Sequence, residues 1–340
     1  MTLATSGNRS DVMNDLARSE SGRLLRQELD RRWPGRTDHL SAIIRYALIP
    51  AGKLLRPIMT LHAAEAVGGD PARVLPAALG MEYLHVATLV HDDIIDGDAT
   101  RRGRSAVPAA YGLANAILAG DHLIFSAFES IVECSRAGVP ADRVVTATDV
   151  LAGAGADLCR GEALEAQLVG DPDTSVAQYL EMIRLKTGAL LRAVCHIGAV
   201  LGGAGPALAE QLARYGEHVG MAFQIRDDLL PYSLPGRATG KPATSDLTNG
   251  RPTLPVMLAY QTGTDAQRQD LASALNRGCS DATDLQRVRE VLAETGALDG
   301  AFRQAAAYGE RARHELASLV PSPGVAVLAV IARWATAREP

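Results

Sequence analysis

A cluster of charged side chains ends an apolar run in the stretch 85–104, HVATLVHDDIIDGDATRRGR. If the run is helical, Asp92 and Asp96 share one face of the helix and Asp93 lies close beside them. Carboxylates at this spacing repel one another unless a cation binds between them. Mg²⁺ takes carboxylate oxygens and waters, usually together with substrate phosphate. The stretch therefore indicates metal-dependent phosphate chemistry, and a solvated helix end with a mixed-charge loop stays an alternative from these residues alone.

The residues around this stretch favour the same chemistry. Arg101 and Arg102 carry forked guanidinium groups, which match phosphate oxygens. A second acidic motif, Asp227 and Asp228, stands in the stretch 223–230, FQIRDDLL, where another apolar run ends. Two such motifs that face each other across a helical bundle can clamp metal ions. Metal ions neutralise the charge that develops when a diphosphate leaves, so the pair of motifs favours metal-assisted loss of diphosphate.

Composition limits the class of protein. The chain has 340 residues, of which 47% are hydrophobic, 21% charged and only 4% aromatic, which favours helices around a sizeable core. The net charge of −5 gives no reason to expect nucleic acid as a partner. Four widely spaced cysteines indicate neither a zinc site nor a disulfide framework. Without a secretory signal or a long uninterrupted apolar run, we expect a cytoplasmic protein with no transmembrane segment.

Helical periodicity, broken by Gly and Pro, runs through most of the chain, with no sustained alternation typical of strands. We therefore predict an all-α protein of about ten or more helices. The helices are expected to form a single domain over residues 21–340. The polar residues 1–20 are expected to be a flexible tail.

Local signals mark several helix ends. Asp70 followed by Pro71 is expected to start the helix that carries the first aspartates. Ser175 and Gln178 are spaced for a capping box, which predicts a further helix from that point. The segment 232–255 is rich in Gly, Pro, Ser and Thr, and its length predicts a lid or binding loop.

Over residues 40–260 the chain resembles the trans-isoprenyl diphosphate synthases, the polyprenyl synthetase family, of the geranylgeranyl or longer-chain type. The resemblance rests on motifs that occur in the family's order. They are DDxxD with RRG (Asp92-Asp93-Ile94-Ile95-Asp96, Arg101-Arg102-Gly103), GKxxRP (Gly52-Lys53-Leu54-Leu55-Arg56-Pro57), KT (Lys186-Thr187), FQxxDD (Phe223 to Asp228) and a lid pattern (Gly240-Lys241-Pro242, Asp246, Gly250-Arg251-Pro252-Thr253-Leu254-Pro255). The implied fold is a helical bundle of the isoprenoid synthase type with a central active-site cavity.

The implied reaction is the Mg²⁺-dependent, head-to-tail condensation of isopentenyl diphosphate with an allylic diphosphate to a linear, all-trans polyprenyl diphosphate. The residues that would bind Mg²⁺ directly are Asp92, Asp96 and Asp227, with Asp93 and Asp228 in support. Those that would hold the allylic diphosphate (dimethylallyl, geranyl or farnesyl) are Arg101, Lys186 and Lys241, and Arg251 of the lid would be a further substrate-binding residue. Those that would hold isopentenyl diphosphate, without metal, are Gly52, Lys53, Arg56, His85 and Arg102. The catalytic set implied by the resemblance is Lys186 with Thr187 and Gln224, whose oxygen dipoles would stabilise a carbocation.

Two positions depart from the family pattern. Pro231 replaces the last aspartate of the second motif, and we expect the helix to stop at or just before it. Arg251 replaces the usual lysine of the lid, which keeps the charge but changes its shape. Metal binding through Asp227 and Asp228 is expected to persist.

Small residues near the first aspartates indicate a long product. Ala87 and Thr88 precede Asp92 by five and four positions, which is roughly 6–7.5 Å along a helix. A bulky side chain there would stop a growing prenyl chain early, so the sequence favours a product of C20 or longer. Phe125 or Phe128 on the next helix is the suggested floor of the deeper pocket.

Two other functions compete with elongation. A class I terpene cyclase shares the fold and the DDxxD motif, but this chain lacks a cyclase-type second motif and keeps Lys53, Arg56 and His85 for a second diphosphate. A regulatory subunit of a heteromeric synthase is supported only by Pro231. The family resemblance also implies a homodimer.

Overall fold

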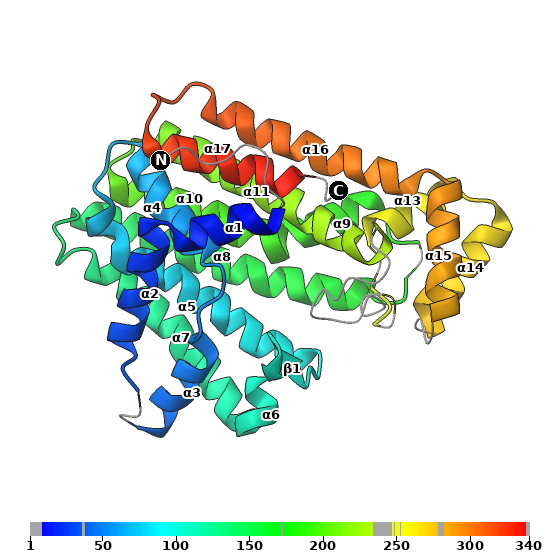
Figure 1. The fold of residues 1–340 in the computed structure, drawn as a ribbon, viewed down its shortest axis with the longest axis horizontal. Coiled ribbons are helices and arrows are strands. Elements are labelled where there is room, and N and C mark those ends of the chain that lie inside the picture. Colours follow the sequence, from blue (N-terminus) through cyan, green and yellow to red (C-terminus); the bar gives the residue numbers. More distant parts are fainter. Residues whose placement is uncertain are drawn as a thin grey trace.

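The structure is a computed structural model that describes residues 9–35, 38–171, 173–233, 247, 249–251, 253–277 and 282–337. Within these residues the regular structure is helical apart from one small two-stranded ribbon, so the predicted all-α class is confirmed. Figure 1 shows the long helices lying side by side. In chain order the elements are α1 (Arg9–Arg18), α2 (Glu20–Arg32), α3 (His39–Leu48), α4 (Leu55–Ala66), α5 (Pro71–Ile95), β1 (Thr100–Arg101), β2 (Arg104–Ser105), α6 (Val107–Tyr111), α7 (Leu113–Glu133), α8 (Ala141–Leu168), α9 (Val176–Ile183), η1 (Arg184–Gly188), α10 (Ala189–Gly202), α11 (Pro206–Ser233), α13 (Leu254–Thr262), α14 (Asp265–Arg277), α15 (Ala282–Glu294), α16 (Ala297–Leu316) and α17 (Pro323–Thr336).

Helix α5 carries the first aspartates through the centre of the bundle. It starts as predicted: the Asp70 side chain accepts a hydrogen bond from the backbone N–H of Ala72 at 2.9 Å, and Pro71 takes the first turn, where no N–H is needed. The helix is largely apolar and buried up to its last turn, and it packs against α4, α7 and α10. Its approach to α7 is close, since a Cβ on Gly80 would lie 2.9 Å from the carbonyl oxygen of Ala127. The first acidic motif therefore stands at the end of a firmly held helix.

A continuous helical stretch, α9–η1–α10, packs beside α5 and carries the KT pair. It begins with the predicted capping box, in which Ser175 and Gln178 exchange hydrogen bonds of 3.2 and 3.0 Å. The η1 turn widens into a π-helix, a feature that often marks functional sites. Within the described part of the chain, this stretch alone is long and apolar enough to cross a membrane. Because 72% of its apolar window is buried inside the protein, we interpret it as a core helix.

The structure corrects the expected end of α11. The sequence predicts that Pro231 stops this helix, but α11 continues past it to Ser233. Proline cannot donate a backbone N–H to the helix ladder, so other contacts must hold the last turn. Tyr232 is buried and its hydroxyl lies 3.2 Å from Thr253 Oγ1, and Arg289 of α15 donates to the Pro231 carbonyl oxygen at 2.5 Å. These tertiary contacts outweigh the local preference of proline.

The expected flexible tail over residues 1–20 is corrected in part. From residue 9 onward the chain forms α1, and Met13 and Leu16 of this helix are buried in the main core. Residues 1–8 lie outside the described residues. The segment is polar overall, but its apolar residues at positions 13 and 16 are one helical turn apart, a spacing that indicates a helix with one buried face.

The arginine loop after α5 is the ribbon β1–β2, in which Arg101 pairs with Arg104. Its two turn residues, Arg102 and Gly103, both have positive φ, at 53° and 76°. Positive φ at both central residues is the signature of a type I′ hairpin turn, which matches the twist of the flanking strands. Glycine adopts this conformation without a steric penalty, which explains the glycine of the RRG motif.

Candidate active site

A cavity of about 380 Å³ lies where the last turn of α5, the η1 turn and the end of α11 meet, and we call it the acidic cavity. Asp92 and Asp96 line it from the α5 side, and Asp227 and Asp228 line it from α11. The structure thus brings the two acidic motifs together, as the sequence predicts. The other polar residues that line this cavity are Arg101, Glu165, Lys186, Thr187, Gln224, Arg251 and Thr253.

Asp93 lies apart from the other aspartates. It is buried and does not line the acidic cavity, and its Oδ1 accepts a hydrogen bond from Arg101 Nε at 2.7 Å. Arg101 also reaches Asp98 Oδ2, at 3.1 Å, and lines the cavity itself. Asp93 therefore holds an arginine at the edge of the cavity.

The acidic cavity suits a divalent metal that binds together with a phosphate ligand. Among the described residues, no three acidic, histidine or cysteine side chains gather closely enough to hold a metal alone. Mg²⁺ is commonly bound by one or two carboxylates plus substrate phosphates, which opposed carboxylates across a cavity allow. Burial raises the pKa of Asp92 to about 6, while Lys186 opposes this shift and Glu162 adds to it. A buried carboxylate in this situation is stabilised by an added cation.

Two cations of the acidic cavity are paired with carboxylates. Lys186 Nζ lies 2.7 Å from Glu162 Oε2 and 2.6 Å from Glu165 Oε2. Burial lowers the pKa of the Lys186 ammonium group, but the two glutamates together have the larger effect, so this pKa is raised. Arg251 Nη2 donates to Asp96 Oδ1 at 2.5 Å, and its Nε lies 3.4 Å from Glu165. The described lining residues nevertheless include five carboxylates and three cations, so negative charge stays in excess and favours a bound metal ion.

A chain of hydrogen bonds joins the KT pair to the second acidic motif. Thr187 Oγ1 donates to Gln224 Oε1 at 2.8 Å, and Gln224 Nε2 donates to Asp228 Oδ1 at 2.9 Å. The other oxygen of Asp228 accepts from the Tyr179 hydroxyl at 2.7 Å. Both oxygens of Asp228 are thus engaged by the protein. These hydrogen bonds fix the orientation of the Asp228 carboxylate at the wall of the acidic cavity.

A second cavity, of about 420 Å³, lies where α4 begins beside α5, and we call it the basic cavity. Its walls include apolar surface from three parts of the chain: Met13 of α1, and the Phe223 and Trp334 rings, which stack 5.4 Å apart. All the residues that the family resemblance assigns to isopentenyl diphosphate line it, namely Gly52, Lys53, Arg56, His85 and Arg102.

Burial dominates the electrostatics of the basic cavity. It lowers the pKa of Arg56 to about 10, and it lowers the pKa of His85 well below its usual value, with Arg56 and Arg102 adding to the second shift. Glu82 is the one acid among the described residues that line it, and burial raises the pKa of Glu82 although Arg56 opposes this shift. The buried Arg56 Nε has no hydrogen-bond partner among the described residues. Such a cluster of cations is stabilised when an anion binds among them.

Neighbouring residues divide between the two cavities. Arg101 lines the acidic cavity and Arg102 the basic one, and in α11 Gln224 lines the acidic cavity and Phe223 the basic one. The two cavities therefore lie against the same short segments of chain. Two anionic ligands would be held close together, one beside carboxylates and the other among cations.

The two predicted chain-length residues lie in neither cavity, and one predicted phosphate ligand is outside the described residues. Lys241 falls outside the described residues, together with the rest of 234–246. Ala87 is fully buried, and the Thr88 hydroxyl donates to the carbonyl oxygen of His85 at 2.8 Å. Neither Ala87 nor Thr88 is among the residues that line the acidic or the basic cavity.

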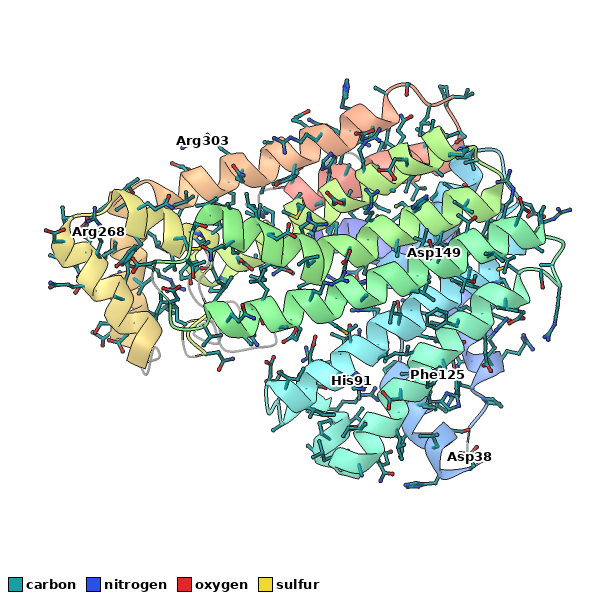
Figure 2. The ribbon with its side chains drawn as sticks, turned by 180° about the vertical axis from the view of Figure 1, so that it is seen from behind. Asp38, His91, Phe125, Asp149, Arg268 and Arg303 are labelled. Carbon is teal, nitrogen blue, oxygen red and sulfur yellow. The ribbon has the colours of Figure 1, made fainter. Side chains whose placement is uncertain are left out.

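The suggested pocket floor on α7 is corrected at one position. Phe125 is 69% exposed, and Figure 2 shows it on the outer side of α7. Phe128 is partly buried and packs against the main core. Of the two phenylalanines, only Phe128 faces the inside of this chain.

Sequence reasoning missed four residues that shape the site: Glu82, Glu162, Glu165 and Tyr179. Glu162 and Glu165 are three apart on α8 and share a face, and Glu82 stands three residues before His85 on α5. These spacings could have indicated from the sequence that the three glutamates lie near the site. Tyr179 has none, because its contact with Asp228 depends on how α9 packs against α11.

Comparison with known proteins gives a consistent family. A family model described as polyprenyl synthetase matches residues 37–292. A geranylfarnesyl diphosphate synthase of Aeropyrum pernix is 39% identical over 287 residues, which cover 84% of this chain and 89% of that protein. A geranylgeranyl diphosphate synthase of Methanosarcina mazei is 37% identical over 304 residues, 89% of this chain and 91% of that protein. The crystal structure of a polyprenyl synthase from Caulobacter crescentus CB15, complexed with calcium and isoprenyl diphosphate, matches with a TM-score of 0.86 at 32% identity, covering 99% of this chain and 100% of that one.

These matches cover the segments that carry both acidic motifs, the GKxxRP turn and the KT pair. The resemblance inferred from the motifs is confirmed, and the use of a divalent metal in the family agrees with the carboxylates of the acidic cavity. The chain belongs to the polyprenyl synthetase family and is a prenyltransferase, a polyprenyl diphosphate synthase.

Proposed function

We propose that the protein catalyses the Mg²⁺-dependent, head-to-tail condensation of isopentenyl diphosphate with an allylic diphosphate to a linear, all-trans polyprenyl diphosphate. The observation that carries this proposal is the pair of adjacent cavities, one lined by both acidic motifs and the other by cations. One diphosphate must leave in this reaction and the other must stay, so the two need different surroundings.

The allylic diphosphate is assigned to the acidic cavity. Mg²⁺ held by Asp92, Asp96 and Asp227 would neutralise the charge that develops on the leaving diphosphate. Lys186 and Arg251 are already at the cavity wall and would exchange their carboxylate partners for phosphate oxygens. The same role for Lys241 stays a prediction from the family pattern.

Isopentenyl diphosphate is assigned to the basic cavity, where it needs no metal. Lys53, Arg56 and Arg102 supply positive charge, and burial keeps His85 neutral, so that it contributes a hydrogen bond rather than a charge. Since this diphosphate is kept in the product, its site has no need to stabilise a departing anion. Cations without metal fit that requirement.

The reaction breaks the bond between C1 and the diphosphate oxygen of the allylic substrate. A new bond forms between C1 and the terminal methylene carbon of isopentenyl diphosphate, and a proton leaves to the released diphosphate. Thr187 and Gln224 are linked by a hydrogen bond at the wall of the acidic cavity, where their oxygen dipoles would face the positive carbon. Electrostatics and positioning suffice, so no protein nucleophile is needed.

Incubation of the purified chain with Mg²⁺, isopentenyl diphosphate and each allylic primer, followed by mass analysis, tests the proposal. We expect linear products extended by five-carbon units, with one diphosphate released for each isopentenyl diphosphate consumed. A cyclic hydrocarbon formed without consumption of isopentenyl diphosphate would contradict it and support a class I terpene cyclase. Activity that needs a second, different chain would support a regulatory subunit.

We propose a product of C20 or longer. The names of the two relatives, geranylgeranyl and geranylfarnesyl diphosphate synthase, support this range without fixing one length. The small side chains of Ala87 and Thr88 support it as well. Ala87→Phe and Thr88→Phe test this, and we expect both to shorten the product. Ala87 is fully buried, so a large side chain there can also disturb the fold, and Thr88→Phe is therefore the more reliable variant. Unchanged product length in both variants would refute the role of these positions.

We propose that the protein is a homodimer that pairs through α7. Several large apolar side chains on this helix are exposed, which is uncommon for a monomer surface when they gather on one element. They are Leu113, Ile117, Leu118, Phe125 and Val132. Light scattering should give twice the chain mass, and Leu118→Glu with Phe125→Glu should give the mass of a single chain. A monomeric wild type would refute this proposal.

A further inference from the structure

Arg26 of α2 connects the N-terminal helices to the turn that lines the basic cavity. Its Nη1 donates to the carbonyl oxygen of Ala17, in the last turn of α1, and to that of Gly22, 3.3 Å away. Its Nη2 donates to the carbonyl oxygen of Gly52 at 3.1 Å. Gly52 lines the basic cavity, whereas Arg26 does not. One side chain therefore ties two helices to the turn without reaching the cavity itself.

The corner between α1 and α2 is built closely around this contact. A Cβ on Gly22 would lie 2.3 Å from the carbonyl oxygen of Ala17, so a larger residue would push the two helices apart. The α1 side of the corner also brings Met13 to the wall of the basic cavity. The corner gives Arg26 a firm base from which to hold the turn.

The turn before α4 requires such a support. Leu54, its last residue, has a left-handed backbone with φ 56° and ψ 32°, and no side chain caps the helix there. Residues other than glycine rarely adopt this conformation, and it persists only where the surroundings hold it. Arg102 packs on Gly52, since a Cβ on Gly52 would lie 2.9 Å from Arg102 Nη2. The turn is therefore held by Arg26 at the Gly52 carbonyl and by Arg102 at the Gly52 Cα.

The hydrogen bond from Arg26 also sets the orientation of the peptide between Gly52 and Lys53. In a trans peptide the C=O and N–H groups point in opposite directions. With the Gly52 carbonyl turned toward Arg26, the N–H of Lys53 is turned away from it. Lys53 follows directly and Arg56 lies in the first turn of α4, so rotation of this peptide would displace both cations of the basic cavity.

We propose that Arg26 is a positioning residue for the site that binds isopentenyl diphosphate. It acts through the Gly52 carbonyl and keeps Lys53 and Arg56 in place for the diphosphate, without touching the ligand. The inference rests on the function proposed for the basic cavity. It predicts that changes at Arg26 affect one substrate and spare the other.

The test compares Arg26→Gln and Arg26→Lys with a matched control, Arg23→Gln. Arg23 is exposed on the same helix and donates to the Arg18 carbonyl oxygen at 2.6 Å, so it also ties α2 to α1 but has no bond to Gly52. We expect Arg26→Gln to raise KM for isopentenyl diphosphate roughly ten-fold, which corresponds to the loss of one charge-assisted hydrogen bond to the turn. KM for the allylic substrate should stay unchanged. Calorimetric titration with isopentenyl diphosphate in metal-free buffer should show the same loss of affinity.

The two remaining variants separate geometry from charge. Arg26→Lys keeps the charge but not the forked donor, so we expect an intermediate KM for isopentenyl diphosphate, and this variant carries the test if Arg26→Gln does not fold. Arg23→Gln should match the wild type. A wild-type KM in both Arg26 variants, equal effects on both substrates, or an equal effect of Arg23→Gln would overturn the proposal. The proposal would also be overturned if Arg26→Lys matched the wild type and the defect of Arg26→Gln disappeared at high salt. That result would mark a long-range charge effect, which salt screens.

These outcomes are distinct from a failure of the proposed function. If the wild type neither binds nor consumes isopentenyl diphosphate, the assignment of the basic cavity is wrong. If the wild type does both and the Arg26 variants do so with unchanged KM, only the role of Arg26 is wrong.

Discussion

The acidic and the basic cavity lie against the same segments but treat charge in opposite ways. In the acidic cavity, Lys186 is paired with Glu165 and Arg251 with Asp96, but the described lining residues include five carboxylates and three cations, so negative charge is in excess. In the basic cavity, Glu82 is the one acid among the lining residues that the structure describes and is itself buried, while the pKa of Arg56 is lowered by burial. The excess of carboxylates in one cavity favours a metal ion, and the excess of cations in the other favours an anion.

This difference matches the two tasks of the proposed reaction. In the acidic cavity a metal that binds Asp96 would take over the carboxylate that Arg251 now contacts, which releases Arg251 for phosphate. Metal and allylic diphosphate would therefore bind cooperatively there. The basic cavity contains no such exchange, so its ligand should bind whether or not a metal is present.

The largest expected effect comes from removing a carboxylate of the acidic cavity. Asp92→Asn removes a proposed metal ligand, and we expect kcat/KM to fall by roughly 10²–10³, the typical loss when charge stabilisation of a transition state is removed. Steady-state assays at saturating Mg²⁺ measure this. Asp149→Asn on the exposed side of α8, labelled in Figure 2, is the control and should keep wild-type activity. Wild-type kinetics in Asp92→Asn would show that the acidic cavity is not the metal site.

The next effect concerns one substrate only. Lys53→Gln removes a cation from the basic cavity, and we expect KM for isopentenyl diphosphate to rise about ten-fold while KM for the allylic diphosphate stays constant. Initial rates over a matrix of both substrate concentrations separate the two constants. Arg303→Gln removes an exposed charge on α16 that lines neither cavity, and it serves as the control. A parallel rise of both constants would erase the distinction between the cavities.

A smaller effect tests the support of the second acidic motif. Tyr179→Phe deletes only the hydroxyl that donates to Asp228, and loss of a hydrogen bond to a charged group costs about 1.5–3 kcal/mol. We expect a lower melting temperature and a several-fold lower kcat, with KM for isopentenyl diphosphate unchanged. Thermal unfolding and kinetics on the same samples measure this. A specific rise of that KM would mean that Tyr179 supports the basic cavity instead.

The smallest expected effect is on stability against pH. Burial, with Arg56 and Arg102, keeps the pKa of His85 well below its ordinary value of 6.5. The unfolded chain therefore binds a proton near pH 6.5 that the folded chain does not, so His85 lowers stability as the pH falls below 6.5, by about 1.4 kcal/mol per pH unit. His85→Gln lacks this penalty and should lose less stability than the wild type between pH 7 and pH 5.5. Parallel denaturation curves at both pH values would speak against a buried, neutral His85.

Much of the site was predictable because its chemistry is local. Asp70-Pro71 and Ser175-Gln178 mark helix starts by short-range hydrogen bonds, and both form as expected. The three lysines of the chain, Lys53, Lys186 and Lys241, all fall in the family motifs, while every other strong cation is arginine. Local spacing and residue type therefore point to most of the groups proposed to bind phosphate.

The remaining features depend on contacts between distant segments. α11 continues through Pro231 because Tyr232 is buried and Arg289 binds the Pro231 carbonyl oxygen, and neither contact can be inferred from the helix alone. The helix at residues 9–18 forms because Met13 and Leu16 have a core to pack against. In each case tertiary packing overrides a local signal, and this packing cannot be read from a single sequence.

We propose that the two diphosphate sites differ in their need for metal. Calorimetry of the wild type with isopentenyl diphosphate, and separately with a non-reactive thio analogue of an allylic diphosphate, in EDTA and in excess Mg²⁺ measures this most directly. We predict that isopentenyl diphosphate binds with similar affinity in both buffers and that the allylic analogue binds only with Mg²⁺. Loss of both ligands in EDTA, or metal-independent binding of the allylic analogue, would show that the two sites do not differ in this way.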